Sequence, residues 1–149
     1  MALVAEDAAD RAQQLVLLTE RLTALIAQET ALIDAREPPL SGPIGEEKAR
    51  LANLSRQEMT RIAETPGLIQ GAPARTLDLL RAATTKFRAA LADHERALRA
   101  VKEVSEGLVR AIAEEIARVK GGPRGYGATG AYAEASTAPA AALALNKTA

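Results

Sequence analysis

Apolar positions recur at steps of three and four residues through three long stretches of the chain, which is the spacing of one face of an α-helix. The first stretch covers about residues 7–36 and ends at Pro38 and Pro39, because proline lacks a backbone donor and disfavours helical geometry in the residue before it. Its row consists of Leu15, Leu18, Leu22, Leu25, Glu29 and Leu32, with Ile26 and Ile33 beside it.

The second stretch covers about residues 44–64, and it has the thinnest apolar side of the three. Ser41 is a candidate cap for this helix, and Pro43 suits its first turn. A linker rich in proline and glycine follows over residues 65–74, in which Leu68 and Ile69 are predicted to cover the end of the bundle. The apolar side of the second helix consists of Leu51, Leu54, Met59 and Ile62.

The third stretch is the longest and covers about residues 74–120. At 1.5 Å per residue it predicts a helix of roughly 70 Å, against roughly 45 Å for the first helix. A second row (Leu79, Ala83, Ala90, Ala97, Val104) leaves open which face is internal. The main row consists of Leu77, Leu80, Thr84, Phe87, Leu91, His94, Leu98, Val101, Ser105, Leu108, Ile112, Ile116 and Val119.

These stretches predict an all-α fold, an elongated antiparallel three-helix bundle or coiled coil with a very long third helix. Helices joined by short loops alternate in direction, and apolar rows repeating every 3.5 residues wind around one another. Because the helix lengths differ, the third helix either overhangs the others or leaves an extra face for a partner. We expect a helical bundle over residues 1–120.

Residues 121–149 are predicted to form a flexible, disordered tail. Gly121, Gly122 and Pro123 end the third helix in the way that C-terminal glycine and proline usually do. The tail has few charged or large apolar residues, so it cannot bury enough surface to offset the entropy of ordering. Its two glycine- or alanine-flanked tyrosines, Tyr126 and Tyr132, are either partner-docking residues or plain linker residues.

Charge and composition exclude several classes of protein. The 19 basic and 19 acidic side chains cancel, so no global field attracts nucleic acid or an anionic membrane. Seven acids against three bases in residues 1–37, and ten bases against seven acids in residues 75–120, predict that the first and last helices lie side by side. No cysteine, no apolar span and no secretory signal are present, so we expect a cytoplasmic protein without stable membrane insertion.

The sequence offers no catalytic constellation, no metal site and no cofactor motif, so we expect a binding protein and not an enzyme. A helical hydrolase would need a convergent polar cluster, and none can be assembled from the residues present. His94 is the one histidine and lies in the third apolar row, so it cannot build a zinc site. It is read as a structural residue, with a pH-sensitive interface role as the alternative.

Glu29 stands among leucines in the first row, where a carboxylate needs a charged or hydrogen-bonding partner. An arginine of the third helix is the expected partner. Glu29 then sets the register of the bundle or lies at its edge, with partner binding as the alternative. The candidate arginines are Arg81, Arg88, Arg96 and Arg99.

The first two helices resemble the FlgN-type flagellar export chaperones over about residues 10–120. The similarity is a run of leucines, a glutamate, an apolar pair, an aspartate and, after a gap, a lysine followed by leucines. The matching residues are Leu17, Leu18, Leu22, Leu25, Ile26, Glu29, Ala31, Leu32, Asp34, Lys48, Leu51 and Leu54.

This resemblance implies a chaperone that binds the C-terminal amphipathic helices of hook–filament junction proteins and delivers them to the flagellar type III export gate. It implies that Tyr126 and Tyr132 contact the export apparatus, and that the chain is a monomer or weak dimer. The alternative is a structural, self-associating coiled coil, such as a phasin-like granule coat or an adaptor. The implied helix groove comprises Leu98, Val101, Leu108, Ile112 and Ile116.

Overall fold

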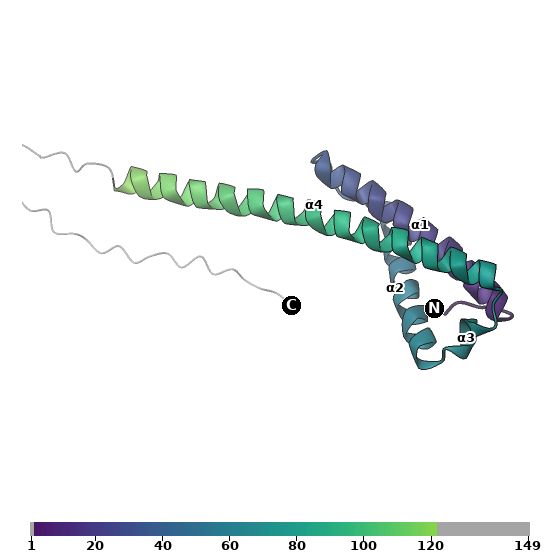
Figure 1. The fold of residues 1–149 in the computed structure, drawn as a ribbon. Helices are drawn as coiled ribbons and strands as arrows, with labels where there is room; N and C mark the ends of the chain where they lie inside the picture. The colour runs from purple at the N-terminus through teal and green to yellow at the C-terminus, as the bar shows by residue number, and fades with distance from the viewer. Residues whose placement is uncertain (1, 122–149) are drawn as a thin grey trace, which may run out of the picture. The chain divides into compact units, whose positions relative to one another are not determined.

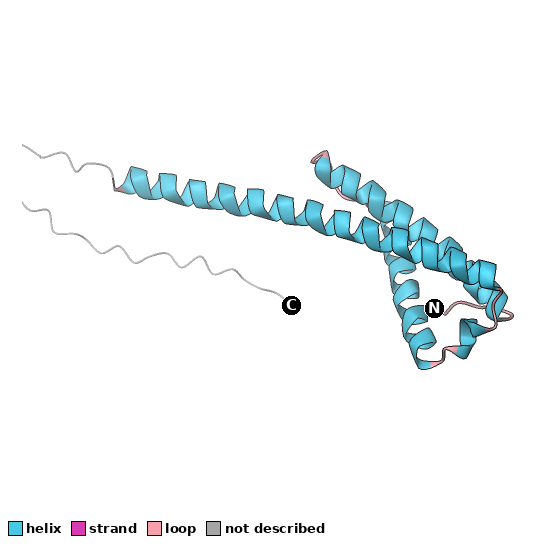
Figure 2. Ribbon diagram, viewed as in Figure 1, coloured by secondary structure: helices cyan, strands magenta, loops and turns pink. Residues whose placement is uncertain are grey.

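The computed structural model describes residues 2–121, and every regular element in that range is a helix (Figure 1, Figure 2). The predicted all-α fold with a very long last helix is confirmed. The predicted linker contains one additional helical turn, and the tail from residue 122 onward lies outside the described residues. The elements are α1 (Ala8–Asp34), α2 (Gly42–Glu64), α3 (Gly67–Gln70) and α4 (Ala74–Lys120).

Local sequence signals account for the helix ends. The Asp7 carboxylate caps α1 by accepting a hydrogen bond from the Asp10 backbone N–H at 2.8 Å. Ser41 is the residue before α2, as predicted, but its side chain makes no capping hydrogen bond. Pro43 lies in the first turn of α2, where a missing N–H costs nothing.

The chain divides into two units, residues 1–110 and residues 111–149. In the first unit α1 is the central helix, because most of the buried apolar residues belong to it. Leu15 and Leu25 are among the most completely buried side chains of this unit, and Leu15, Val16 and Leu80 form its core cluster. The buried residues of α1 are Arg11, Ala12, Leu15, Val16, Leu18, Thr19, Leu22, Leu25, Ile26 and Glu29.

Consecutive long helices of the first unit alternate in direction, as the short loops predict. Arg11 near the start of α1 pairs with Glu58 near the end of α2, so these helices are antiparallel. Thr30 near the end of α1 contacts His94, while Leu15 packs with Leu80, so α1 and α4 run parallel.

Small residues decide which face of α4 is internal. Leu80, Ala83 and Ala97 are buried, whereas Leu91 and Leu98 are 40% and 49% exposed. The sequence left open which of the two rows is internal, and the buried positions of α4 come from both, with Leu80 from the main row and Ala83 and Ala97 from the second. Ala83 and Ala97 therefore lie on the packed side of α4 with Leu80, whereas Leu91 and Leu98 lie on its more exposed side.

Beyond Ala97, no residue of α4 is buried. Residues 98–110 of the first unit are all exposed, so α4 overhangs α1 in this unit. In the second unit, residues 111–121 are likewise exposed. Of the two predicted outcomes for the length mismatch, the overhang is the one observed.

The first and last long helices lie side by side, but full ion pairs join α1 to α2 instead. Among the described residues, the charged contact between α1 and α4 is Glu29 with His94, which is ionic only when the histidine is protonated. The pairs between α1 and α2 are Arg11–Glu58, Arg21–Glu47 and Glu29–Lys48.

Candidate partner-binding surfaces

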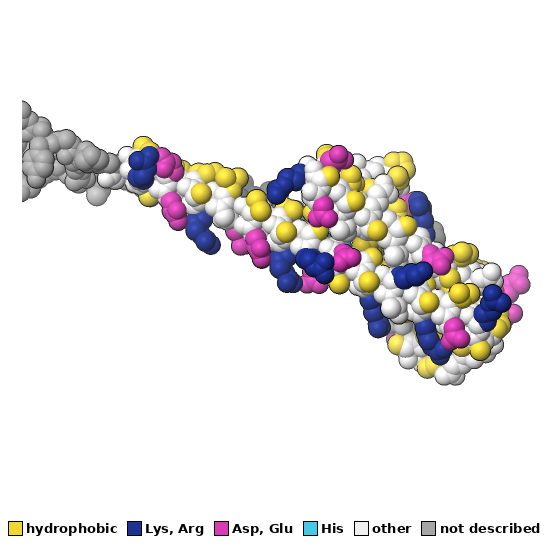
Figure 3. Space-filling view, turned by 45° about the horizontal axis from the view of Figure 1, so that its top comes forward, with side chains coloured by type: hydrophobic (Ala, Val, Ile, Leu, Met, Phe, Trp, Pro, Cys, Tyr) yellow, Lys and Arg dark blue, Asp and Glu magenta, His cyan; other side chains and the backbone are white. Residues whose placement is uncertain are grey.

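An exposed row of apolar side chains follows α4 beyond the part that packs on α1. Leu98, Val101 and Leu108 are 49%, 40% and 61% exposed. Single exposed apolar residues are common, but a row at steps of three and four is the pattern of a helix that packs against another. Figure 3 shows such side chains along α4, interspersed with charged ones. We call Leu98, Val101 and Leu108 the α4 row.

Sequence reasoning missed one neighbour of this row. Val104 follows Val101 by three residues and precedes Leu108 by four, and half of its surface is exposed. It was assigned to the second apolar row, although its spacing also fits the first. Its place beside the α4 row widens the apolar face that a partner would cover.

Two predicted groove residues, Ile112 and Ile116, belong to the second unit. Each is 51% exposed, so both are available for contact. Their part in a partner-binding site stays a prediction. Tyr126 and Tyr132 lie outside the described residues.

Charge pairs within α4 support the exposed helix without a partner. Arg99 donates to Glu95 at 3.1 Å, and the Lys102 Nζ lies 3.8 Å from a Glu106 carboxylate oxygen. Pairs one turn apart each stabilise an isolated helix by about 0.2–0.5 kcal/mol. The α4 row is therefore carried on a helix with its own local support.

Glu29 connects three helices through its carboxylate. Lys48 of α2 donates to Glu29 Oε2, and His94 Nε2 of α4 lies 3.7 Å from the same oxygen. The other ring nitrogen of His94 is 3.2 Å from the Thr30 hydroxyl. The predicted arginine partner from the third helix is wrong. The lysine comes from α2 because antiparallel packing brings the start of α2 to the end of α1.

The glutamate and the lysine that carry the family resemblance are thus a contacting pair. Glu29 is only 7% exposed, so its charge needs this partner. That this pair sets the register of α1 against α2 stays a prediction. His94 is partly buried against the same group, in keeping with its structural reading.

Glu58 is a second buried carboxylate, and sequence reasoning missed it. Its side chain is fully buried on α2 and accepts hydrogen bonds from Arg11 Nη1 at 2.5 Å, Arg61 Nη1 at 3.1 Å and the Leu3 backbone N–H at 3.2 Å. The signal was its position four residues after Leu54, in the apolar row of α2. We read this cluster as structural, because both carboxylate oxygens of Glu58 already accept hydrogen bonds from within the chain.

An exposed pair joins the middle of α1 to the start of α2. Arg21 donates from Nε and Nη2 to the two oxygens of Glu47 at 2.7 and 2.8 Å. These hydrogen bonds lower the pKa of Glu47 and raise that of Arg21. The bidentate geometry adds a directional contact between α1 and α2, next to the Lys48 that pairs with Glu29.

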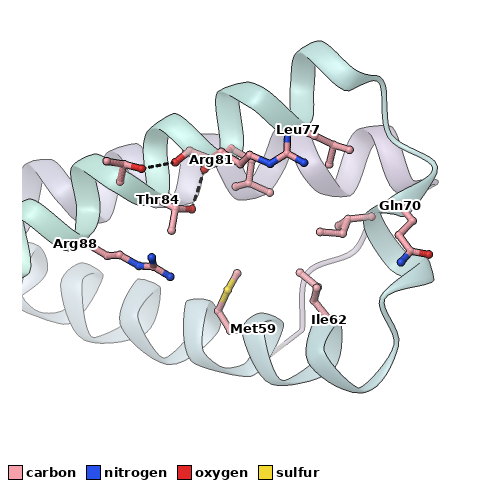
Figure 4. Close-up of a pocket in the computed structure, with 10 residues that line it drawn as sticks. Met59, Ile62, Gln70, Leu77, Arg81, Thr84 and Arg88 are labelled. Atoms are coloured by element: carbon pink, nitrogen blue, oxygen red, sulfur yellow. Dashed lines mark hydrogen bonds between the residues drawn. The ribbon is translucent and has the colours of Figure 1, made fainter.

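A groove of about 470 Å³ lies between α2, α3 and α4 (Figure 4). Apolar side chains contribute its floor, and two arginines of α4 lie on its edge. Thr84 and Thr85 donate their hydroxyls to backbone carbonyls of their own helix. We call this feature the α2–α4 groove, and its lining residues are Met59, Ile62, Ile69, Gln70, Leu77, Leu80, Arg81, Thr84, Thr85 and Arg88.

Residues 2–121 contain neither a membrane-spanning helix nor a cluster of metal-ligating side chains. No helix in that part of the chain has the length and apolarity that a bilayer crossing requires. No group of three or more histidine, cysteine or acidic side chains in the same range is arranged to hold a metal ion.

The fold and the uncovered row define an all-α protein with an unpartnered helix face. The chain is 44% identical over 131 residues to the flagellar basal-body protein FlbY of Caulobacter vibrioides. The aligned region covers 87% of the chain and 88% of that protein. The chain therefore belongs to the FlbY family, a flagellum-associated family. No protein-family model matches the chain, and no solved structure matches it. The relative is not named as a FlgN-type chaperone, so that finer assignment stays a prediction.

Proposed function

We propose that this chain is a cytoplasmic flagellar export chaperone and not an enzyme. It would bind the C-terminal amphipathic helices of hook–filament junction proteins and deliver them to the flagellar type III export gate. The observation that carries the proposal is the α4 row, an apolar face left uncovered on a formed helix. The flagellar name of the relative and the resemblance to FlgN-type chaperones support the same function.

The α4 row suits the recognition of an amphipathic helix by its apolar face. Leu98, Val101 and Leu108 present anchors at steps of three and seven, which lie on one face of a helix and match the anchors on an amphipathic partner helix. Each side chain is about half exposed, so covering it would contribute on the order of 1 kcal/mol or more. A chaperone of this kind would keep the junction proteins from assembling early by occupying their own assembly helices.

A calorimetric titration tests the proposal. The full chain is titrated with C-terminal segments of hook–filament junction proteins from the same genome, and a saturable one-to-one complex is expected. Leu98→Asp or Leu108→Asp should weaken the complex at least about tenfold, because each places a charge in the face that the bound helix would cover. Leu79→Asp is the matched control, since Leu79 is 53% exposed on α4 but lies outside the row.

The tail tyrosines would act at a later step, at the export gate. Tyr126→Ala combined with Tyr132→Ala is expected to leave the titration unchanged and to reduce secretion of the junction proteins. A loss of binding to the junction segments in this variant would instead assign the tyrosines to the cargo site.

The second candidate function is self-association through α4. The spacing of the α4 row is also that of a coiled-coil seam, which favours pairing with a second copy. Sedimentation of the full chain separates the two candidates. A tight dimer that Leu108→Asp dissociates, together with no binding of any junction segment, would favour the structural coiled coil over the chaperone.

A further inference from the structure

We propose that the α2–α4 groove is a second docking surface, one that binds an acidic amphipathic helix of a protein partner. The groove lies among residues 59–88 of the first unit and shares no residue with the α4 row. The proposal does not depend on the chaperone function, because it rests on the shape and charge of a different surface.

The floor of the groove is apolar and accessible. Met59 is 46% exposed, although it stands in the apolar row of α2. Ile62 and Ile69 are partly buried and pack against the core cluster, so the floor is backed by a fixed structure. In Figure 4, Met59 and Ile62 of α2 face Leu77 of α4 across the groove.

The edge of the groove is positive. Among its ten lining residues the charged ones are Arg81 and Arg88, and no carboxylate is present. Arg81 donates to Asp78 on the solvent side, where both side chains are at least 70% exposed. Such an exposed pair contributes little and is readily exchanged for a partner's carboxylate.

Arg88 has no competing acid. No acidic residue stands three or four positions from it on α4, and it forms no ion pair with any residue in the range 2–121. A guanidinium beside an apolar floor suits a carboxylate, because it donates two parallel hydrogen bonds and is weakly hydrated.

The length of the groove favours a helix over a single side chain. From Leu77 to Arg88 the α4 wall extends roughly 16 Å, which is about three helical turns. Apolar residues at steps of three and four on a partner helix would meet the floor, and acids beside them would meet the two arginines.

A comparable hollow on the other side of α4 has a different charge pattern. It measures about 460 Å³ and lies between α1 and α4, where Asp34, Asp93 and Lys86 provide both signs of charge. The chain's own tail is a poorer occupant than an acidic helix. Residues 122–149 contain one acid, Glu134, against two bases.

Two synthetic helices test the proposal against the full chain. One has about 15 residues with leucines at helical steps and glutamates beside them, and the other carries lysine in place of each glutamate. The glutamate helix is expected to bind about tenfold more tightly at low salt. Arg88→Glu should weaken its binding about fivefold or more, and Met59→Asn, which removes apolar contact without adding a charge, should weaken the binding of both helices.

The matched control is Lys86→Glu, the same charge reversal on the opposite side of α4, which should leave both affinities within about twofold. Equal affinity for the two helices, or binding that Arg88→Glu and Met59→Asn leave intact, would overturn the proposal. If Glu134→Lys raised the affinity for the glutamate helix about tenfold, the chain's own tail would be the occupant of the groove. If the chain formed a dimer that Arg88→Glu dissociated, the occupant would be a second copy of the chain. Either result would replace the proposed partner helix.

Discussion

Arg11 of α1 donates a hydrogen bond from Nη1 to Glu58 Oε2 of α2 at 2.5 Å in the interior of the first unit. The same carboxylate accepts from the backbone of Leu3 and from Arg61. One buried charge therefore ties the N-terminal segment and two helices together. Such a pair is weak evidence for added stability, but removing one partner leaves the other charge buried and unpaired.

Glu58→Ala is accordingly expected to destabilise the chain by about 3–5 kcal/mol, because it leaves Arg11 without a counter-charge. Urea denaturation followed by circular dichroism measures the loss. The double variant Arg11→Met with Glu58→Leu should recover most of it, since apolar residues of similar size remove the buried charge altogether.

The matched control for this pair is Glu103→Ala on the exposed part of α4, which should change the free energy of unfolding by no more than about 0.5 kcal/mol. A cost below about 1 kcal/mol for Glu58→Ala would mean that water reaches Arg11 and that the cluster is not a buried lock.

Replacing two helical glycines by alanine should change the stability of the chain in opposite directions. A Cβ at Gly45 would lie 2.8 Å from the Leu40 carbonyl oxygen, which forces the loop before α2 to shift. A Cβ at Gly107 would meet nothing within 4 Å, so alanine there gains its helix propensity of about 1 kcal/mol. Thermal denaturation should show a lower midpoint for Gly45→Ala and a higher one for Gly107→Ala. The same sign for both would contradict the close contact at Gly45.

The Arg21–Glu47 pair predicts a pH dependence on the acid side. Because hydrogen bonds from Arg21 lower the pKa of Glu47 in the folded state, the stabilisation is complete above the ordinary value of 4.5. It is lost as the pH falls through the lower folded-state pKa. The free energy of unfolding should therefore drop less between neutral and acid pH in Arg21→Gln than in the unmodified chain. Equal drops in the two proteins would rule out this contribution.

The helices themselves were predictable because their boundaries depend on local chemistry. Pro38 and Pro39 end the first helix region, and Thr65, Pro66 and Gly67 end the second, as the structure shows within two residues. These signals act through backbone donors and dihedral angles, so they need no knowledge of the tertiary structure.

The partners of buried charges were not predictable in the same way. Periodicity shows that Glu29 shares a face with leucines, but it does not show which helix brings a cation to that face. Lys48 reaches it because α2 begins where α1 ends, whereas the expected arginines of α4 point elsewhere. Glu58 was overlooked because Met59, the next residue, was assigned to the buried side of α2.

The α4 row was predictable as an apolar row but not as an exposed one. Whether Leu98 is covered depends on how far α1 extends beside α4, and α1 ends at Asp34. The alanines at positions 83 and 97 then decide that α1 meets their side of α4 and not the side of Leu91. Close packing against small residues is a tertiary effect, and the spacing of leucines does not contain it.

The central claim is that the α4 row is the surface that binds a junction-protein helix. Hydrogen–deuterium exchange of the full chain, with and without a saturating C-terminal segment of a hook–filament junction protein, tests it most directly. The proposal predicts slower exchange of the amides in residues 98–110 on binding, with little change over residues 80–97, which already pack on α1. Unchanged exchange over residues 98–110 in the complex would contradict the claim. So would slow exchange of these amides in the free chain that becomes fast on dilution, because it would mean that a second copy of the chain covers the row.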